Sequence, residues 1–223
     1  NKAYGTVEPI KGTNPRQLYE HQKQAMENLT VMDTEEKYST LVVLPTGGGK
    51  TYTASTWLLK HAIDRNKKIL WLAHRHTLLE QAAESFQKYA YATTIPHTSS
   101  FTYRIVSGAV AHDRAVDIKA KDNILIASKD SIGRNLPALN SWLKGEEELY
   151  LVIDEAHHST AKTYRKVIEY LQKKVKHLKL IGLTATPFRT GEEGAGQLGN
   201  LYLNGMPEHR GIAYKIDLKE LIK

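Results

Sequence analysis

Short apolar runs rich in β-branched residues alternate with longer helical patterns along the chain from Thr40 onward. This alternation is typical of a parallel sheet covered by helices, in which the crossovers between strands are right-handed. We therefore predict an α/β fold with a three-layer, doubly wound, mostly parallel sheet. The strands are expected at Leu41–Leu44, Lys68–Ala73, Tyr103–Ser107, Asn123–Ala127, Leu149–Ile153 and Leu178–Leu183.

The segments between these strands carry apolar residues at three- and four-residue spacing, which is the pattern of an amphipathic helix. Helices are expected at Lys50–Ile63, Thr77–Ala90 and Thr163–Val175, with a shorter one at Gln22–Leu29. Residues 1–14 are interpreted as a flanking segment and residues 15–190 as one domain. Residues 191–223 begin with a glycine-rich stretch of little periodicity, so we expect a linker toward an absent second domain.

The composition excludes several classes of protein. The chain has no cysteine, which rules out disulfides, thiolate zinc sites and cysteine nucleophiles. The missing cysteines also make a cytoplasmic protein the simplest interpretation. No apolar run approaches the roughly 18 residues that a membrane-spanning helix requires, so no membrane contact is expected. The net charge of +7 favours a polyanionic partner. An ordinary basic surface is the alternative.

A glycine-rich segment, Leu44–Thr51, lies where the first strand ends and the first long helix begins. Successive glycines allow backbone N–H groups to converge on phosphate oxygens, and the helix N-terminus adds positive potential. Lys50 is expected to reach the β and γ phosphates, and Thr51 to bind magnesium. Leu44 replaces the first glycine of the general P-loop pattern, and an incidental glycine-rich turn is the alternative. The predicted nucleotide-binding residues here are Thr46, Gly47, Gly48, Gly49, Lys50 and Thr51.

Two adjacent carboxylates, Asp154 and Glu155, follow the buried run Leu149–Ile153. Ligands of open parallel sheets bind beyond the carboxyl ends of the strands, which is also the edge where the glycine-rich segment opens. We expect Asp154 to hold magnesium, directly or through water, and Glu155 to orient and deprotonate an attacking water. Taken alone, such a pair is more often a helix cap.

Three segments together carry a resemblance to a known family. The sequence Asp-Glu-Ala-His at Asp154–His157 resembles motif II of DEAH-type superfamily 2 proteins, the glycine-rich segment resembles the helicase form of the phosphate loop, and Gly182–Pro187 resembles motif III. The chain therefore resembles the N-terminal RecA-like motor domain of a superfamily 2 DEAD/DEAH-box helicase, a P-loop NTPase, from about Leu18 to Arg189. Asp-Glu-Ala-His-His and Thr-Ala-Thr-Pro-Phe-Arg are most similar to the type III restriction enzyme Res-subunit branch.

The resemblance implies roles for four further residues. His157 would link the nucleotide to the nucleic-acid side, and Thr184 and Thr186 would relay the nucleotide state. Gln22 would read the adenine of ATP, since a carboxamide both donates and accepts. The arginine that is common in that segment of the family is replaced by Tyr19, although Arg16 lies close in the sequence.

The resemblance also places nucleic acid at the strand ends. Phosphate contacts are expected from His74, Arg75, Gly108 and Ser128. Such motors hold the sugar-phosphate backbone of DNA or RNA, so binding should be independent of base sequence and sensitive to salt. DNA is favoured over RNA. The neighbouring histidines, His74 with His76 and His157 with His158, leave a metal site as a minor alternative, because no third ligand is visible.

The family binds ATP between two RecA-like lobes, and the second lobe supplies arginines that stabilise phosphoryl transfer. The resemblance therefore implies a second RecA-like domain of the same full-length chain as a partner. We expect weak ATP binding, little turnover and no unwinding from the isolated chain. Two alternatives stay open, a P-loop switch or kinase and a non-catalytic nucleic-acid-binding module. A switch is disfavoured because the sequence has no Asn-Lys-x-Asp guanine signature. A non-catalytic module is disfavoured because all of the predicted catalytic and metal-binding residues of the two motifs are intact, namely Lys50, Thr51, Asp154 and Glu155.

Overall fold

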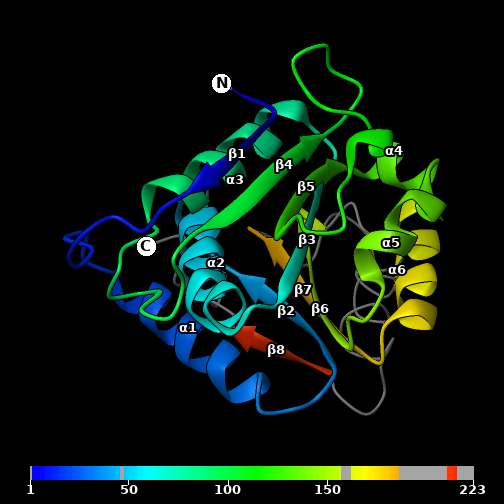
Figure 1. The fold of residues 1–223 in the computed structure, drawn as a ribbon. Coiled ribbons are helices and arrows are strands. Elements are labelled where there is room, and N and C mark those ends of the chain that lie inside the picture. The colour runs from blue at the N-terminus through cyan, green and yellow to red at the C-terminus, as the bar shows by residue number, and fades with distance from the viewer. Residues whose placement is uncertain (1, 46–47, 157–161, 186–209, 215–223) are drawn as a thin grey trace.

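A computed structural model describes residues 2–45, 48–156, 162–185 and 210–214. Its centre is an eight-stranded sheet in the order β1-β4-β5-β3-β6-β7-β2-β8, with helices on both faces (Figure 1). All neighbouring strands are parallel except β1, which pairs antiparallel with β4. The strands are β1 (Tyr4–Val7), β2 (Tyr38–Val43), β3 (Lys68–Ala73), β4 (Phe101–Val106), β5 (Ile124–Ser128), β6 (Glu148–Asp154), β7 (His177–Thr184) and β8 (Arg210–Tyr214). The predicted fold class is confirmed.

The helices divide between the two faces of the sheet, as Figure 1 shows. One face carries α1, α2 and α3, and the other carries α4, α5 and α6. The bounds are α1 (Glu20–Met32), α2 (Gly48–His61), α3 (His76–Lys88), α4 (Lys129–Gly133), α5 (Asn140–Leu143) and α6 (Lys162–Lys174). Short 3-10 turns lie at Ile63–Arg65, Ala115–Asp117 and Leu136–Leu139. Among the described helices, none is both long and apolar enough to cross a bilayer.

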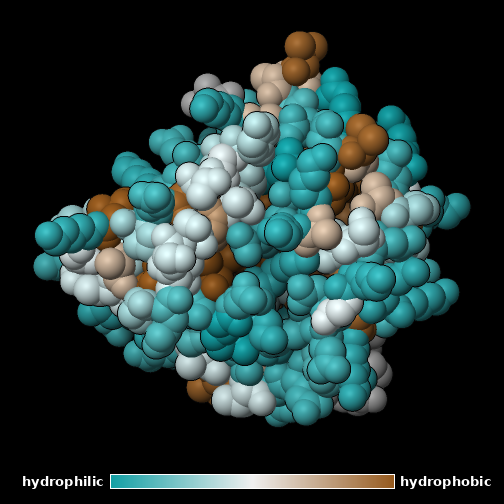
Figure 2. Space-filling view, viewed as in Figure 1, coloured by the Kyte–Doolittle hydropathy of each residue, from teal (hydrophilic) through white to brown (hydrophobic). Residues whose placement is uncertain are grey.

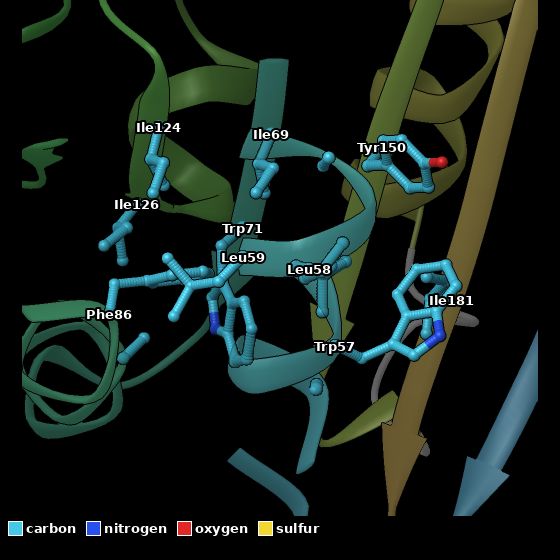
Figure 3. Close-up of a cluster of buried hydrophobic side chains, with 14 of the residues drawn as sticks. Trp57, Leu58, Leu59, Ile69, Trp71, Phe86, Ile124, Ile126, Tyr150 and Ile181 are labelled. Atoms are coloured by element: carbon cyan, nitrogen blue, oxygen red, sulfur yellow. The ribbon is translucent and has the colours of Figure 1, made fainter. Parts of the chain in front are cut away.

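Each central strand sends alternate side chains into two separate cores, because successive residues of a strand point to opposite faces. On one face Trp71 and Ile126 pack with Leu58 and Phe86 of the helices, and Figure 3 shows these side chains converging between α2, α3 and the sheet. Covering both faces explains why the strands are continuous apolar runs. Replacing the fully buried Trp71 with alanine is expected to cost about 3–5 kcal/mol.

The surface contrasts with these cores. Hydrophilic residues cover most of the face seen in Figure 2, and apolar residues appear there in small separate groups. The large apolar side chains exposed among the described residues are Tyr4, Ile10, Tyr19, Val31, Val110 and Val116.

Two edge strands and two short helices were not expected from the sequence. β1 lies in the segment interpreted as flanking, and β8 lies in the segment interpreted as a linker, where it pairs with β2. Both are short strands that depend on a neighbouring strand for their hydrogen bonds, so local periodicity does not reveal them. α4 and α5 are too short for a periodic pattern. The domain boundaries at residues 15 and 190 stay a prediction.

Candidate nucleotide site and nucleic-acid edge

The carboxyl ends of the parallel strands form one edge of the sheet, which we call the C-terminal edge. Strand pairing places Val43 of β2 beside Thr184 of β7, and Asp154 of β6 beside Leu183 of β7. The Leu44 N–H extends this ladder by donating to the Thr184 carbonyl over 3.1 Å. Only β7 therefore separates the start of the glycine-rich loop from the end of β6. Thr184 itself is fully buried at this junction.

Lys50 and Asp154 meet at this edge although they are 104 residues apart in the chain. The Lys50 Nζ donates to Asp154 Oδ1 over 2.7 Å, and the two residues are only 7% and 1% exposed. Lys50 belongs to the first turn of α2 and Asp154 is the last residue of β6. The sheet thus brings together the lysine and the carboxylate that were predicted to face one triphosphate. Removing one partner of such a buried pair leaves an uncompensated charge, at a cost of about 3–5 kcal/mol.

The remaining groups near Asp154 fit a magnesium ion. Asp154 Oδ1 also accepts the Glu155 backbone N–H over 2.9 Å, whereas Oδ2 is buried with no hydrogen-bond partner in the described part of the chain. Thr51 is 7% exposed at the start of α2. The described residues hold no cluster of three His, Asp or Glu suited to a metal. Magnesium usually binds through one or two carboxylates plus phosphates and waters, so a lone carboxylate oxygen suits it.

Glu155 is held by the residues that follow β3. Arg75 donates through Nη2 to Glu155 Oε1 over 2.6 Å, and His74 Nε2 lies 3.5 Å from Oε2. Burial raises the pKa of Glu155, but the charges of Lys50, Arg75 and His74 outweigh it and hold the pKa below its ordinary value. Burial is also the main reason that the pKa of His74 is lowered. Glu155 is therefore an ionised carboxylate at neutral pH.

The backbone of Glu155 adopts a left-handed conformation, with φ of 53°. For a residue other than glycine this costs on the order of 1–3 kcal/mol, and such strain is concentrated at functional sites. The sharp turn directs the Glu155 side chain to the end of β3 rather than along β6. β3 and β6 are neighbours in the sheet, so the contact between Glu155 and Arg75 depends on the strand order, and no sequence motif predicts it.

Gln22 lies close to the phosphate loop. It is 2% exposed in the first turn of α1, and its Oε1 accepts the Tyr19 backbone N–H over 2.9 Å. A Cβ built on Gly49 would lie 3.6 Å from Gln22 Nε2, which places the amide nitrogen beside the loop. The carboxamide thus caps α1 with its oxygen and faces the loop with its nitrogen.

Arg16 lines a cavity next to the start of α2. Its guanidinium carbon is 3.8 Å from the centre of the Tyr52 ring, and Nη1 donates to the Tyr89 hydroxyl over 2.7 Å. The cavity, of about 300 Å³, is also lined by Thr51. Sequence reasoning noted Arg16 but not the two tyrosines, because aromatic residues on amphipathic helices are more often core residues. Tyr19, which stands at the position of the family's common arginine, is 68% exposed, whereas Arg16 lines this cavity.

The other predicted nucleic-acid contacts also lie at strand ends. Ser128 ends β5 and caps α4, where its Oγ accepts the Ser131 N–H over 3.2 Å. Gly108 is exposed just beyond β4. With His74 and Arg75 just after β3, all four predicted residues lie at the end of β3, β4 or β5 or just beyond it. Thr46, Gly47, His157 and Thr186 lie outside the described residues.

The comparisons with known proteins agree with this geometry. The family described as "Type III restriction enzyme, res subunit" matches residues 16–189. The DEAD-box ATP-dependent DNA helicase Fancm of Drosophila melanogaster is 27% identical over 182 residues, which cover 79% of this chain and 12% of Fancm. The chain therefore spans a small part of this relative's length.

Solved structures share the fold. The helicase domain of Pyrococcus furiosus Hef superposes with a TM-score of 0.56 and 23% identity, over 85% of this chain and 37% of that one. Dbp5 of S. cerevisiae, bound to RNA and ADP BeF3, superposes with a TM-score of 0.63 and 14% identity, over 92% of this chain and 51% of that one.

Proposed function

Because this chain belongs to the family of type III restriction enzyme res subunits, we propose that it is the ATP-binding motor domain of a nucleic-acid-dependent ATPase. The larger protein would be a helicase or translocase that acts on DNA, such as a restriction subunit. The observation that carries this proposal is the 2.7 Å contact between Lys50 and Asp154 at the C-terminal edge. This contact assembles a phosphate-binding lysine and a metal-binding carboxylate at one point.

The chemistry proposed is hydrolysis of ATP. Lys50 and the loop amides bind the β and γ phosphates. Thr51 and Asp154 would hold magnesium, which would neutralise charge on the phosphate oxygens. Glu155 orients the attacking water and takes its proton as the water oxygen bonds to the γ phosphorus and the bond to the leaving ADP oxygen breaks. Gln22, beside the loop, reads the adenine edge.

The contact between Arg75 and Glu155 supplies a physical link between nucleic acid and hydrolysis. Arg75 is proposed as a phosphate contact, yet here its guanidinium binds the carboxylate proposed as the general base. A nucleic-acid phosphate that attracts Arg75 would loosen this hold and free Glu155 to meet water. We assign His157, Thr184 and Thr186 to the same coupling between the nucleotide and the bound strand.

The remainder of the motor is proposed to lie outside this chain. A second RecA-like domain would close over the nucleotide and supply the arginines for phosphoryl transfer, an effect of about 10³ to 10⁵ in rate in well-studied cases. We place the domain at residues 15–190, the linker at 191–223 and the protein in the cytoplasm. DNA is preferred as the partner because Fancm, the relative described above, is named as a DNA helicase.

The test is an ATPase assay of the full-length protein with duplex DNA, single-stranded DNA and RNA, beside Glu155→Gln. We expect stimulation by DNA, and a loss of about 10² to 10⁴ in rate for Glu155→Gln, which keeps the shape of the side chain without its basicity. A guanine-selective protein indifferent to every nucleic acid would instead support a P-loop switch.

A further inference from the structure

Positive charge is concentrated on α6 and the residues that follow it. Residues 162–176 contain six basic residues and one acidic residue, which gives this segment a formal net charge of +5, compared with +7 for the whole chain. All six basic residues are exposed, and we call them the α6 basic face: Lys162, Arg165, Lys166, Lys173, Lys174 and Lys176. Helices α1 and α3, in contrast, each carry two glutamates and one lysine.

The protein itself does not neutralise the α6 basic face. Within the described part of the chain, none of its six residues makes an ion pair or a hydrogen bond. Lys174 alone has a ring contact, with Nζ 5.3 Å from the centre of the Tyr170 ring. The helix is held to the sheet by its other side, where Val167 and Leu171 are fully buried in the core. The six charges are therefore not needed to dock α6.

The charges at the start of α6 also oppose the helix. Lys162, Arg165 and Lys166 lie in its first turns, where the helix dipole disfavours cations. Lys162 and Lys166 are four residues apart, so they are like charges on adjacent turns. Lys173 and Lys174 lie in the last turn, where the dipole favours them. Local stability thus accounts for the end of the basic face but not for its start, which points to a ligand outside the described chain.

The basic face begins beside the nucleic-acid edge. Its helix packs against α4, as Figure 1 shows, and Lys129 Nζ of α4 lies 5.5 Å from the centre of the Tyr164 ring of α6. Ser128, which caps α4, is one of the phosphate contacts expected at the C-terminal edge. α6 ends just before β7 begins at His177. The basic face therefore runs from the C-terminal edge toward the opposite edge of the sheet.

The chemistry of this face fits a duplex better than a single strand or a protein. Single strands are usually bound by stacking on exposed aromatic rings, and protein interfaces have an apolar or aromatic centre. Among the described residues, none of the exposed large apolar side chains lies on α6. The 13 residues of the helix span about 18 Å, which corresponds to about five base pairs of a duplex.

We propose that the α6 basic face binds the phosphate backbone of duplex DNA that continues from the strand contacts at the C-terminal edge. This inference rests on the proposed function and adds to it a second contact surface, away from the nucleotide. Such binding is independent of base sequence and depends on salt, because each cation that meets a phosphate releases a counterion.

The decisive variant combines Lys162→Gln, Arg165→Gln and Lys166→Gln in the full-length protein. Its affinity for a labelled duplex is measured by fluorescence anisotropy over a series of salt concentrations. Each lost phosphate contact lowers the slope of log K against log salt by about 0.9, so the slope should become smaller in magnitude by about 2 to 3. At low salt the affinity should fall by about tenfold to a hundredfold.

The matched control removes the same charge from exposed lysines outside the basic face. It combines Lys11→Gln, Lys23→Gln and Lys60→Gln, and its slope should differ from that of the parent by less than about 1. A second control, Lys162→Arg with Lys166→Arg, keeps the charge and should bind the duplex as the parent does.

Two further measurements separate the basic face from folding and from the strand contacts. The melting temperature of the triple α6 variant should equal or exceed that of the parent, because the charges removed oppose the helix dipole. A short single strand, which reaches only the C-terminal edge, should bind the parent and the triple α6 variant equally.

Three results would overturn the proposal. One is a parental slope and affinity in the triple α6 variant, and another is an equal loss in the lysine control, which would show only a general effect of net charge. The third is unchanged duplex binding with lost binding of a poly-glutamate chain, which would make the face a site for an acidic protein. If the parent binds ATP and DNA, each result refutes only the role of α6. A parent that binds neither refutes the proposed function as well.

Discussion

The two edges of the sheet hold buried charges in different ways. At the C-terminal edge Asp154 has one carboxylate oxygen without a partner among the described residues, and Glu155 has a strained backbone. At the opposite edge Asp33 accepts hydrogen bonds from Tyr38 and Tyr150 over 2.8 Å each and pairs with Lys179 over 3.0 Å. The unsatisfied edge is suited to binding a ligand, and the satisfied edge is suited to stability.

The satisfied edge is a continuous network. Lys179 Nζ also contacts Glu148 over 2.5 Å, and Arg65 donates to Glu148 and to the Tyr150 hydroxyl over 3.0 and 2.7 Å. No buried polar side-chain atom of this network is without a partner in the part of the chain that the structure describes. Because Asp33 caps the end of α1, the network also fixes the helix that carries Gln22 at its other end.

Lys179→Met tests the stabilising edge. Methionine leaves Asp33 and Glu148 buried without their shared cation, so the free energy of unfolding should fall by about 3–5 kcal/mol. ATP affinity, measured well below the unfolding temperature, should stay unchanged. The control Lys173→Met, at an exposed position of α6, should alter the free energy of unfolding by less than about 0.5 kcal/mol. Equal stabilities of the two variants would show that the network is not the stabilising edge.

Asp154→Asn tests the binding edge. Asparagine keeps the volume but is a poorer ligand for magnesium, so ATP hydrolysis by the full-length protein should fall by about 10² to 10³. Raising the magnesium concentration should restore part of the activity. Activity close to the parent value at every magnesium concentration would remove Asp154 from the metal site.

Arg75→Ala probes how the binding edge is restrained. Without the guanidinium Glu155 is freer to meet water, so hydrolysis without nucleic acid should rise. The ratio of the rate with DNA to the rate without it should fall by about fivefold. The two rates should be measured in one steady-state assay. A lower basal rate with unchanged stimulation would show that Arg75 assists Glu155 rather than restraining it.

The dependence of the free energy of unfolding on acidic pH gives a smaller test of the stabilising edge. Burial raises the pKa of Glu148, but Lys179 and Arg65 outweigh it and hold the pKa below its usual 4.5. A lowered folded-state pKa means that this stabilisation is complete above pH 4.5 and is lost as the pH falls through the lower value. The loss of stability from pH 5 to 3 should therefore be shallower in Glu148→Gln. Identical slopes in chemical denaturation would contradict this assignment.

Sequence reasoning reached the binding edge but not the stabilising one. The convergence of Lys50 and Asp154 follows from a general rule, since ligands of parallel sheets bind at the carboxyl ends of the strands. The network at Asp33 and Lys179 follows no motif, because its members are isolated polar residues from the end of α1, a 3-10 turn and the starts of β2, β6 and β7. The same reason hides the Arg75–Glu155 contact. This contact depends on β3 and β6 being neighbours, which the order of elements along the chain does not specify.

The assignment of Lys50 to the triphosphate has a direct test, the rate of ATP hydrolysis by Lys50→Ala in the full-length protein with DNA present. Lys60→Ala is the matched control, because Lys60 lies on the same helix α2 but is exposed. We predict that Lys50→Ala loses nearly all hydrolysis while Lys60→Ala keeps the parent rate. Equal rates in the two variants would mean that the C-terminal edge is not the nucleotide site.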